Sequence, residues 1–223
     1  MSGEAPLNVD IVSDIVCPWC WLGARYFLNA AKNFTEQTGQ TVKLNWRPYM
    51  LDSNIPEDGT IYADYMKAKF GDTPSNKWKA MRAHLEEAGP DAGINFRFSG
   101  IPMRPNTLRA HRLMRWAGGQ GLGTDMAERL FKAFFEEHQD VGSVNVLSAL
   151  ANDVGLDSAL TKELLETDRD TAETQAEMLV FREMGISGVP TFIYNKSYAV
   201  QGAQPAETHL AYLQKAAGLN GVK

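Results

Sequence analysis

The sequence predicts an α/β protein in which the two ends of the chain build one small sheet and a large all-helical domain is inserted between them. Strand-like runs occupy the first fifty residues and return after residue 185, whereas the stretch between them carries almost only helical apolar spacing. The expected division assigns residues 1–51 and 185–223 to the sheet domain and residues 52–184 to the helical domain.

The first part of the sheet domain is expected to form a strand, a helix and a second strand. Residues 7–16 are dense in β-branched side chains, which favour a strand. The following run has apolar residues at positions 24, 27, 28, 31 and 34, a helical spacing. Gly39 ends that helix, and residues 41–50 alternate as a second strand. Two strands joined in this way lie parallel with a right-handed crossover.

Seven helices are expected in the inserted domain, separated by glycine or proline. They lie near residues 61–70, 75–88, 106–117, 124–138, 144–154, 158–167 and 169–184. Ser143 and Asp157 are expected to cap the N-termini of the helices that follow them. A short β-leaning piece at residues 94–98 interrupts the series.

Two further patterns of this region are expected to be structural. The glycine-rich run at residues 118–123 lacks the spacing of a phosphate-binding loop and lies between two helices, so it predicts a turn. The aromatic cluster Phe131, Phe134 and Phe135 predicts core packing, not a stack against a cofactor.

Strand signals return near the C-terminus. Residues 188–194 and 198–202 predict a β-hairpin around a turn at residues 195–197, and residues 205–217 predict a closing amphipathic helix. A βαβ unit, a helical insert and a ββα unit follow one another in this order in a thioredoxin-like domain that carries an inserted helical domain. The sequence therefore predicts that fold.

The only two cysteines of the chain stand three residues apart, in Cys17-Pro18-Trp19-Cys20, where the first strand gives way to the first helix. Pro18 suits the first helical position, which places Cys17 at the N-cap. Unpaired N–H groups and the positive end of the helix dipole favour a thiolate there, so Cys17 is the expected nucleophile. Cys20, one turn later, faces inward as the expected resolving thiol. A zinc site is not expected, since the four histidines offer no pair at ligand spacing.

Composition narrows the choice of partners and compartment. A net charge of −5 without a basic patch argues against nucleic acid or an anionic membrane as partner. No run approaches 18 apolar residues, and residues 1–6 have neither the basic nor the apolar region of a signal peptide. The expected compartment is the cytosol, where disulfides are usually transient and catalytic.

Several motifs together resemble the DsbA-like thioredoxin superfamily, and within it the FrnE-like cytosolic dithiol oxidoreductases. They are the Cys17–Cys20 motif, Trp46-Arg47-Pro48-Tyr49, Asn106-Thr107-Leu108-Arg109-Ala110-His111-Arg112-Leu113, Gly188-Val189-Pro190-Thr191-Phe192 and residues 197–204. The resemblance implies a cis bond between Val189 and Pro190 that faces the active-site cysteine and offers the Val189 backbone to an extended substrate. The other interpretation is a proline that merely opens an edge strand.

The substrate groove is expected to have Pro18, Trp19 and Trp21 among its lining, together with residues of the 106–113 helix. His111 either contributes to this site or is a packed core residue. The two interpretations of His111 stay open at the level of the sequence.

One departure from the resemblance concerns the proton of Cys20. Thioredoxins carry a buried acid six residues before the first cysteine, and here that position is Ile11. The nearest acids, Asp10 and Asp14, alternate onto the other face of the strand. Asp14 either tunes the site from the strand end or is a solvated turn residue, and proton transfer from Cys20 relies on water or on Asp14.

A second departure separates the chain from its glutathione-dependent relatives. Kappa-class glutathione transferases and hydroxychromene-carboxylate isomerases typically have serine at the first active-site position and an aspartate after the last strand that holds the amino group of glutathione. This chain has Cys17 and Gln204 there. Both changes favour a thiol–disulfide oxidoreductase or isomerase that works through a mixed disulfide.

The rival hypothesis is a glutathione-dependent isomerase or transferase acting on an aromatic or polyketide-like molecule, in which Cys17 only activates glutathione. A third is a binding module with a vestigial dithiol. No tightly bound cofactor is expected, and disulfide-containing proteins or glutathione are the expected partners. The substrate, the direction of electron flow and the oligomeric state, including a homodimer, stay open.

Overall fold

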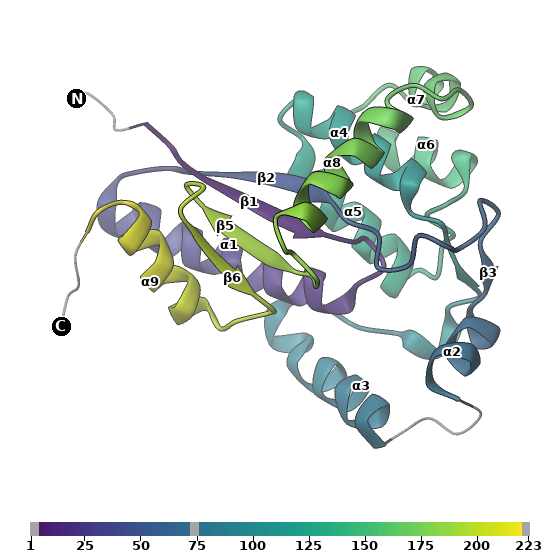
Figure 1. Cartoon of the computed structure of the whole chain (residues 1–223), viewed down its shortest axis with the longest axis horizontal. Helices are drawn as coiled ribbons and strands as arrows, with labels where there is room; N and C mark the ends of the chain where they lie inside the picture. Colours follow the sequence, from purple (N-terminus) through teal and green to yellow (C-terminus); the bar gives the residue numbers. More distant parts are fainter. Residues whose placement is uncertain (1–4, 72–75, 220–223) are drawn as a thin grey trace.

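A computed structural model describes residues 5–71 and 76–219, and it contains the predicted sheet (Figure 1). Strand β1 (Leu7–Ser13) pairs parallel with β2 (Val42–Pro48) and antiparallel with β5 (Thr191–Tyr194). Strand β6 (Tyr198–Gln201) pairs antiparallel with β5, which gives the order β2-β1-β5-β6. The thioredoxin-like α/β fold expected from the sequence is therefore confirmed.

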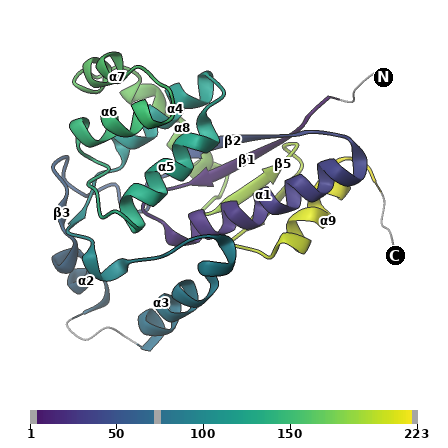
Figure 2. The ribbon, with the colours of Figure 1, turned by 180° about the vertical axis from the view of Figure 1, so that it is seen from behind.

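Helices cover both faces of this sheet. Helices α1 (Pro18–Thr38) and α9 (Ala206–Ala216) lie against one face, where Phe27 packs with Val9 and Ile11 of β1. Helix α8 (Thr171–Glu183) lies on the opposite face, where Phe181 packs with Val12. Figures 1 and 2 show the two layers from the front and from behind.

The other helices extend the molecule beyond the sheet. They are α2 (Tyr62–Phe70), α3 (Asn76–Ala88), α4 (Leu108–Gly119), α5 (Gly123–Phe135), α6 (Val144–Asp153) and α7 (Ser158–Leu165). Helices α4 to α7 gather beyond the β2 edge, whereas α2 and α3 lie on the side where α1 begins (Figure 2). Among residues 5–71 and 76–219, no helix has the length and apolar character needed to cross a bilayer.

The β-leaning piece at residues 94–98 is not a strand, so that expectation is wrong. Short 3₁₀ helices at Pro90–Ala92 and Phe98–Gly100 flank it, and Phe96 and Phe98 stack with ring centroids 5.3 Å apart. Both rings also pack edge-on against Phe135. These aromatic side chains pack in the core between helices and not on a sheet. A two-stranded pair that the sequence did not predict, β3 (Thr60–Ile61) with β4 (Met103–Arg104), lies nearby.

The local predictions for the helical region have mixed outcomes. The predicted turn between α4 and α5 lies at residues 120–122 of the 118–123 run, since Gly118 and Gly119 end α4 and Gly123 begins α5. The phenylalanine cluster of α5 is buried as predicted. Asp157 caps α7 by accepting a hydrogen bond from the Leu160 N–H at 2.9 Å. Ser143 stands at the N-cap of α6, but its side chain makes no capping hydrogen bond.

Candidate active site

The dithiol lies where the sequence predicted it, at the junction of β1 and α1. Cys17 is the N-cap of α1 with extended backbone angles, and Pro18 follows at the first helical position. The Cys20 N–H donates to the Cys17 carbonyl at 3.0 Å, which closes the first turn. Both cysteines are free thiols and both are buried, with 4% of Cys17 and none of Cys20 exposed.

Cys17 faces the loop before β5. The Val189–Pro190 bond is cis, so the interpretation of Pro190 as a mere strand opener is wrong. The Cys17 thiol donates to the Val189 carbonyl, with 3.8 Å between sulfur and oxygen. This loop packs closely on α1, because a Cβ added to Gly23 would lie 3.2 Å from Pro190 Cγ and 3.1 Å from Ala203 Cα. A glycine at position 23 lets the helix and the loop approach each other.

Cys20 occupies a different electrostatic environment. Burial raises the pKa of the Cys20 thiol well above its usual value, and the adjacent Cys17 raises it further. The Ser13 hydroxyl and the Asp14 backbone N–H favour the Cys20 thiolate, but they do not offset burial. Cys20 is therefore a protonated thiol at neutral pH and must lose its proton before it can attack a disulfide.

Asp14 is buried, with 1% of its surface exposed, so its interpretation as a solvated turn residue is wrong. Its Oδ2 accepts from the Leu51 N–H at 2.8 Å, and its Oδ1 lies 3.5 Å from His111 Nε2. Burial by itself would raise the pKa of Asp14, but contact with His111, the charge of Arg104 and the Leu51 N–H outweigh it and lower the pKa. Asp14 is thus a buried carboxylate, held ionised from several elements.

His111 comes from α4 and is also buried, with 3% exposed. Its Nε2 lies 3.0 Å from the Tyr49 carbonyl, which is closer than the Asp14 carboxylate. The two interpretations of His111 are therefore not exclusive, because it is packed in the core and also lies 3.5 Å from the Asp14 carboxylate.

The three expected groove residues next to the cysteines differ in how far they are buried. Trp21 is buried, with 1% exposed, and packs against the rings of Phe131 and Phe135. Its indole N–H donates to Glu128 at 2.9 Å. It cannot line an accessible groove, and that expectation is wrong. Pro18 and Trp19 are half-buried, and Trp19 stacks on His84 of α3, with ring centroids 5.5 Å apart.

Three residues near the site were missed. Ser13 is on the same side of β1 as Ile11, two residues on, and the alternation of the strand could have placed it under α1. No sequence signal joined Arg104, which contributes positive charge beside Asp14, or His84, which covers Trp19, to the dithiol. Both residues come from distant parts of the helical domain.

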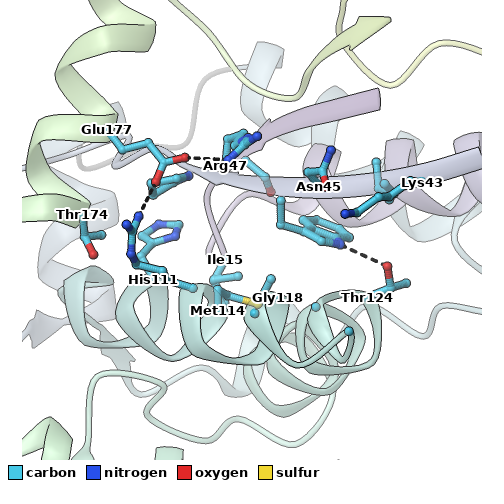
Figure 3. Close-up of a pocket in the computed structure, with 18 of the residues that line it drawn as sticks. Ile15, Lys43, Asn45, Arg47, His111, Met114, Gly118, Thr124, Thr174 and Glu177 are labelled. Atoms are coloured by element: carbon cyan, nitrogen blue, oxygen red, sulfur yellow. Dashed lines mark hydrogen bonds and ion pairs between the residues drawn. The ribbon is translucent and has the colours of Figure 1, made fainter. Parts of the chain in front are cut away.

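A cavity of about 660 Å³ lies between β2 and helices α4, α5 and α8 (Figure 3). Ser13, Ile15 and His111 are part of its wall, whereas neither cysteine is. Glu177 bridges Arg47 at 3.1 Å and Arg115 at 2.9 Å across one end of the cavity.

The chain is similar in sequence and in structure to DsbA-like proteins. The chain matches the DSBA-like thioredoxin domain over residues 8–214. The uncharacterized protein YwbO of Bacillus subtilis is 30% identical over 190 residues, which cover 84% of this chain and 86% of YwbO. The crystal structure of a probable DsbA oxidoreductase from Streptomyces coelicolor is 26% identical and covers 97% of this chain and 92% of its own, with a TM-score of 0.84.

A more distant structure shares the fold alone. It is the cytosolic disulfide reductase DsbM from Pseudomonas aeruginosa with GSH, 19% identical, covering 96% of this chain and all of that one, with a TM-score of 0.65. The domain match spans nearly the whole chain and includes both cysteines and the cis proline. The chain therefore belongs to the DsbA-like thioredoxin domain family.

Proposed function

We propose that the protein is a thiol–disulfide oxidoreductase or isomerase that works through a mixed disulfide on Cys17. The observation that carries this proposal is the inequality of the two thiols. Cys17 stands at a helix N-terminus beside a substrate-facing loop, whereas Cys20 is fully buried one turn behind it. An attacking thiol needs the first environment, and a resolving thiol that reacts only within the molecule tolerates the second.

The exchange has two steps. The Cys17 thiolate attacks one sulfur of a substrate disulfide, so that a mixed disulfide forms and the first substrate thiolate leaves. Cys20 then loses its proton and attacks the Cys17 sulfur, which releases the second substrate thiolate. The protein dithiol is oxidised by two electrons as the substrate disulfide is reduced, and each substrate thiolate takes a proton from solvent. The reverse sequence oxidises a substrate dithiol.

Substrate docking is assigned to the loop beside Cys17. Val189 is half-buried, its carbonyl already accepts from the Cys17 thiol, and Pro18 and Trp19 are half-buried next to it. An extended substrate segment that paired with the Val189 backbone would bring its disulfide to the sulfur. The motifs shared with FrnE-like enzymes and the cytosolic DsbM of the same fold support a FrnE-like enzyme of the cytosol.

The test is reduction of the insulin disulfides in the presence of a thiol reductant. Wild-type protein should accelerate the reaction, and Cys17→Ser should reduce the acceleration to the background rate, because the oxygen cannot form the mixed disulfide. Cys17→Ser activity equal to wild type would refute the proposal. A Cys17→Ser protein that keeps its thermal unfolding midpoint excludes misfolding as the cause.

Glutathione is a candidate partner, since DsbM of the same fold was solved with GSH. It also serves the rival proposal, in which Cys17 activates glutathione toward a small aromatic or polyketide-like molecule. Gln204, at the position of the aspartate that would hold the glutathione amino group, donates its neutral amide to the Gln201 carbonyl at 3.0 Å. Glutathione-dependent turnover of such a molecule that persists in Cys20→Ser would favour the rival.

A further inference from the structure

The second step of the proposed reaction requires a proton to leave a buried site. Cys20 has no exposed surface, and its thiol is the favoured form. The position at which thioredoxins carry a buried acid is Ile11, which packs against α1 and α9. The protein must therefore move this proton with other groups.

Ser13 is the polar side chain of β1 that faces Cys20. It is 2% exposed, and its hydroxyl lies where it stabilises the Cys20 thiolate. Among the described residues the Ser13 oxygen has no hydrogen-bond partner. A buried hydroxyl whose polar neighbour is the Cys20 thiol is unfavourable in a core, so its retention at this position calls for a function.

The geometry around His111 fixes where it can accept a proton. Its Nε2 lies near two acceptors, the Tyr49 carbonyl and the Asp14 carboxylate, so the network assigns the proton of the neutral ring to Nε2. The lone pair is then on Nδ1. Asp14 lies on the opposite side of the ring, where its negative charge stabilises the imidazolium that would form.

The cavity joins the two groups. Both Ser13 and His111 belong to its wall, and Figure 3 shows His111 on the α4 side of the space, near Ile15. Lys43, which also lines the cavity, is exposed, so the space opens to solvent. A cavity of about 660 Å³ with polar groups in its wall has room for many waters, each of which occupies about 30 Å³.

We propose that Ser13, cavity water and His111 form the path by which the Cys20 proton leaves. The Cys20 proton passes to the Ser13 oxygen as the Ser13 proton passes to water, and a water proton passes to Nδ1 of His111. The Cys20 thiolate then attacks the Cys17 sulfur, and the imidazolium returns its proton to solvent through the cavity. Asp14 acts as a positioning residue for His111. This inference rests on the proposed function, because it concerns its second step.

Other charged groups face this path. Arg104 of β4 contributes positive charge beside Asp14, and Glu177 of α8 is paired with Arg47 of β2 and Arg115 of α4 across the cavity. Lys43 has no ion-pair partner within the described part of the chain.

The experiment is a single turnover of reduced protein with oxidised glutathione, followed by the intrinsic tryptophan fluorescence, to which Trp19 and Trp21 beside the dithiol contribute. The first phase, attack by Cys17, should be linear in glutathione disulfide, and the second, resolution by Cys20, should be independent of it. Ser13→Ala and His111→Gln should slow the second phase at pH 7 by on the order of 10²-fold and leave the first within about twofold. His111→Gln should also change the pH profile of the second phase, because it removes the proton acceptor of the path.

Two controls separate proton transfer from structure. Thr124→Val removes a hydroxyl that lines the same cavity and binds Trp46 at 3.2 Å, and both phases should stay within about twofold of wild type. His111→Ala should regain part of its second-phase rate when imidazole is added, because the cavity admits it. A purely structural role of His111 predicts no rescue.

The proton path would be overturned if folded Ser13→Ala and His111→Gln proteins completed the second phase at the wild-type rate between pH 5 and 8. The second phase of the wild-type protein would still support the proposed function in that case. A wild-type protein with a first phase but no second phase would overturn the proposed function itself, and the proton path with it. The two failures are therefore distinguishable.

Discussion

Asp14 and His111 show that residues brought together only by folding define the surroundings of the dithiol. The sequence placed Cys17 at a helix start correctly, because the strand, the proline and the helical spacing are all local signals. It could not decide the burial of Asp14, since the groups that hold its charge belong to α4, β4 and the segment after β2. Trp21 was a different failure, because its spacing from Ala24 already indicated the buried side of α1.

The buried carboxylate leads to a prediction for Asp14→Asn. The pKa of Asp14 is lower in the folded protein than its ordinary value of 3.8, so as the pH falls the unfolded chain binds this proton first. The stabilisation by Asp14 is therefore present above about pH 4 and is lost as the pH falls through the folded-state pKa. Asp14→Asn should lower the free energy of unfolding by about 1.5–3 kcal/mol at pH 7, and by less at pH 3.

Urea unfolding of both proteins at pH 7 and pH 3 measures this difference. The pH dependence is the informative part, because loss of packing alone would be the same at both pH values. An unfolding free-energy difference that does not change between pH 7 and pH 3 would contradict the assignment of Asp14 as a buried, charged group.

At the scale of single elements, local sequence patterns predicted most helices and strands. They failed where a segment packs against residues that are distant in the sequence. The predicted ranges for α3, α6 and α8 differ from the observed ones by only a few residues, since the apolar spacing that predicts each helix lies within its own segment. Residues 94–98 have aromatic side chains at alternate positions, as a strand would, but they have no strand to pair with and fill the space beside Phe135. Tertiary packing therefore overrides the strand propensity of residues 94–98.

Two helix starts offer a matched test of capping. Asp157 accepts a hydrogen bond from the third residue after it, whereas Ser143 stands at the equivalent position of α6 without a side-chain bond. Asp157→Ala should lower the free energy of unfolding by about 1 kcal/mol, and Ser143→Ala should change it by less than about 0.5 kcal/mol. Thermal unfolding of the two variants in one buffer provides the comparison. Equal losses would show that the hydrogen bond of Asp157 is not the source of its effect.

At the scale of the whole molecule, the order of strands and helices was enough to predict the sheet from the two ends of the chain. The cavity beside Ser13 and His111 was beyond such reasoning, because β1, β2, α4, α5 and α8 each contribute part of its wall. The Glu177 bridge between Arg47 and Arg115 likewise joins three elements that no local pattern connects. The sequence predicted where the two cysteines lie, and the fold supplies the groups around them.

The central claim is that Cys17 alone meets the substrate and Cys20 alone resolves the complex. It is tested most directly by incubating Cys20→Ser and Cys17→Ser with a disulfide-containing peptide and mapping the products by mass spectrometry. The account predicts a stable peptide adduct on Cys17 in Cys20→Ser and no adduct in folded Cys17→Ser. An adduct on Cys20 at a similar rate, or an unreactive Cys17 in the folded protein, would contradict it.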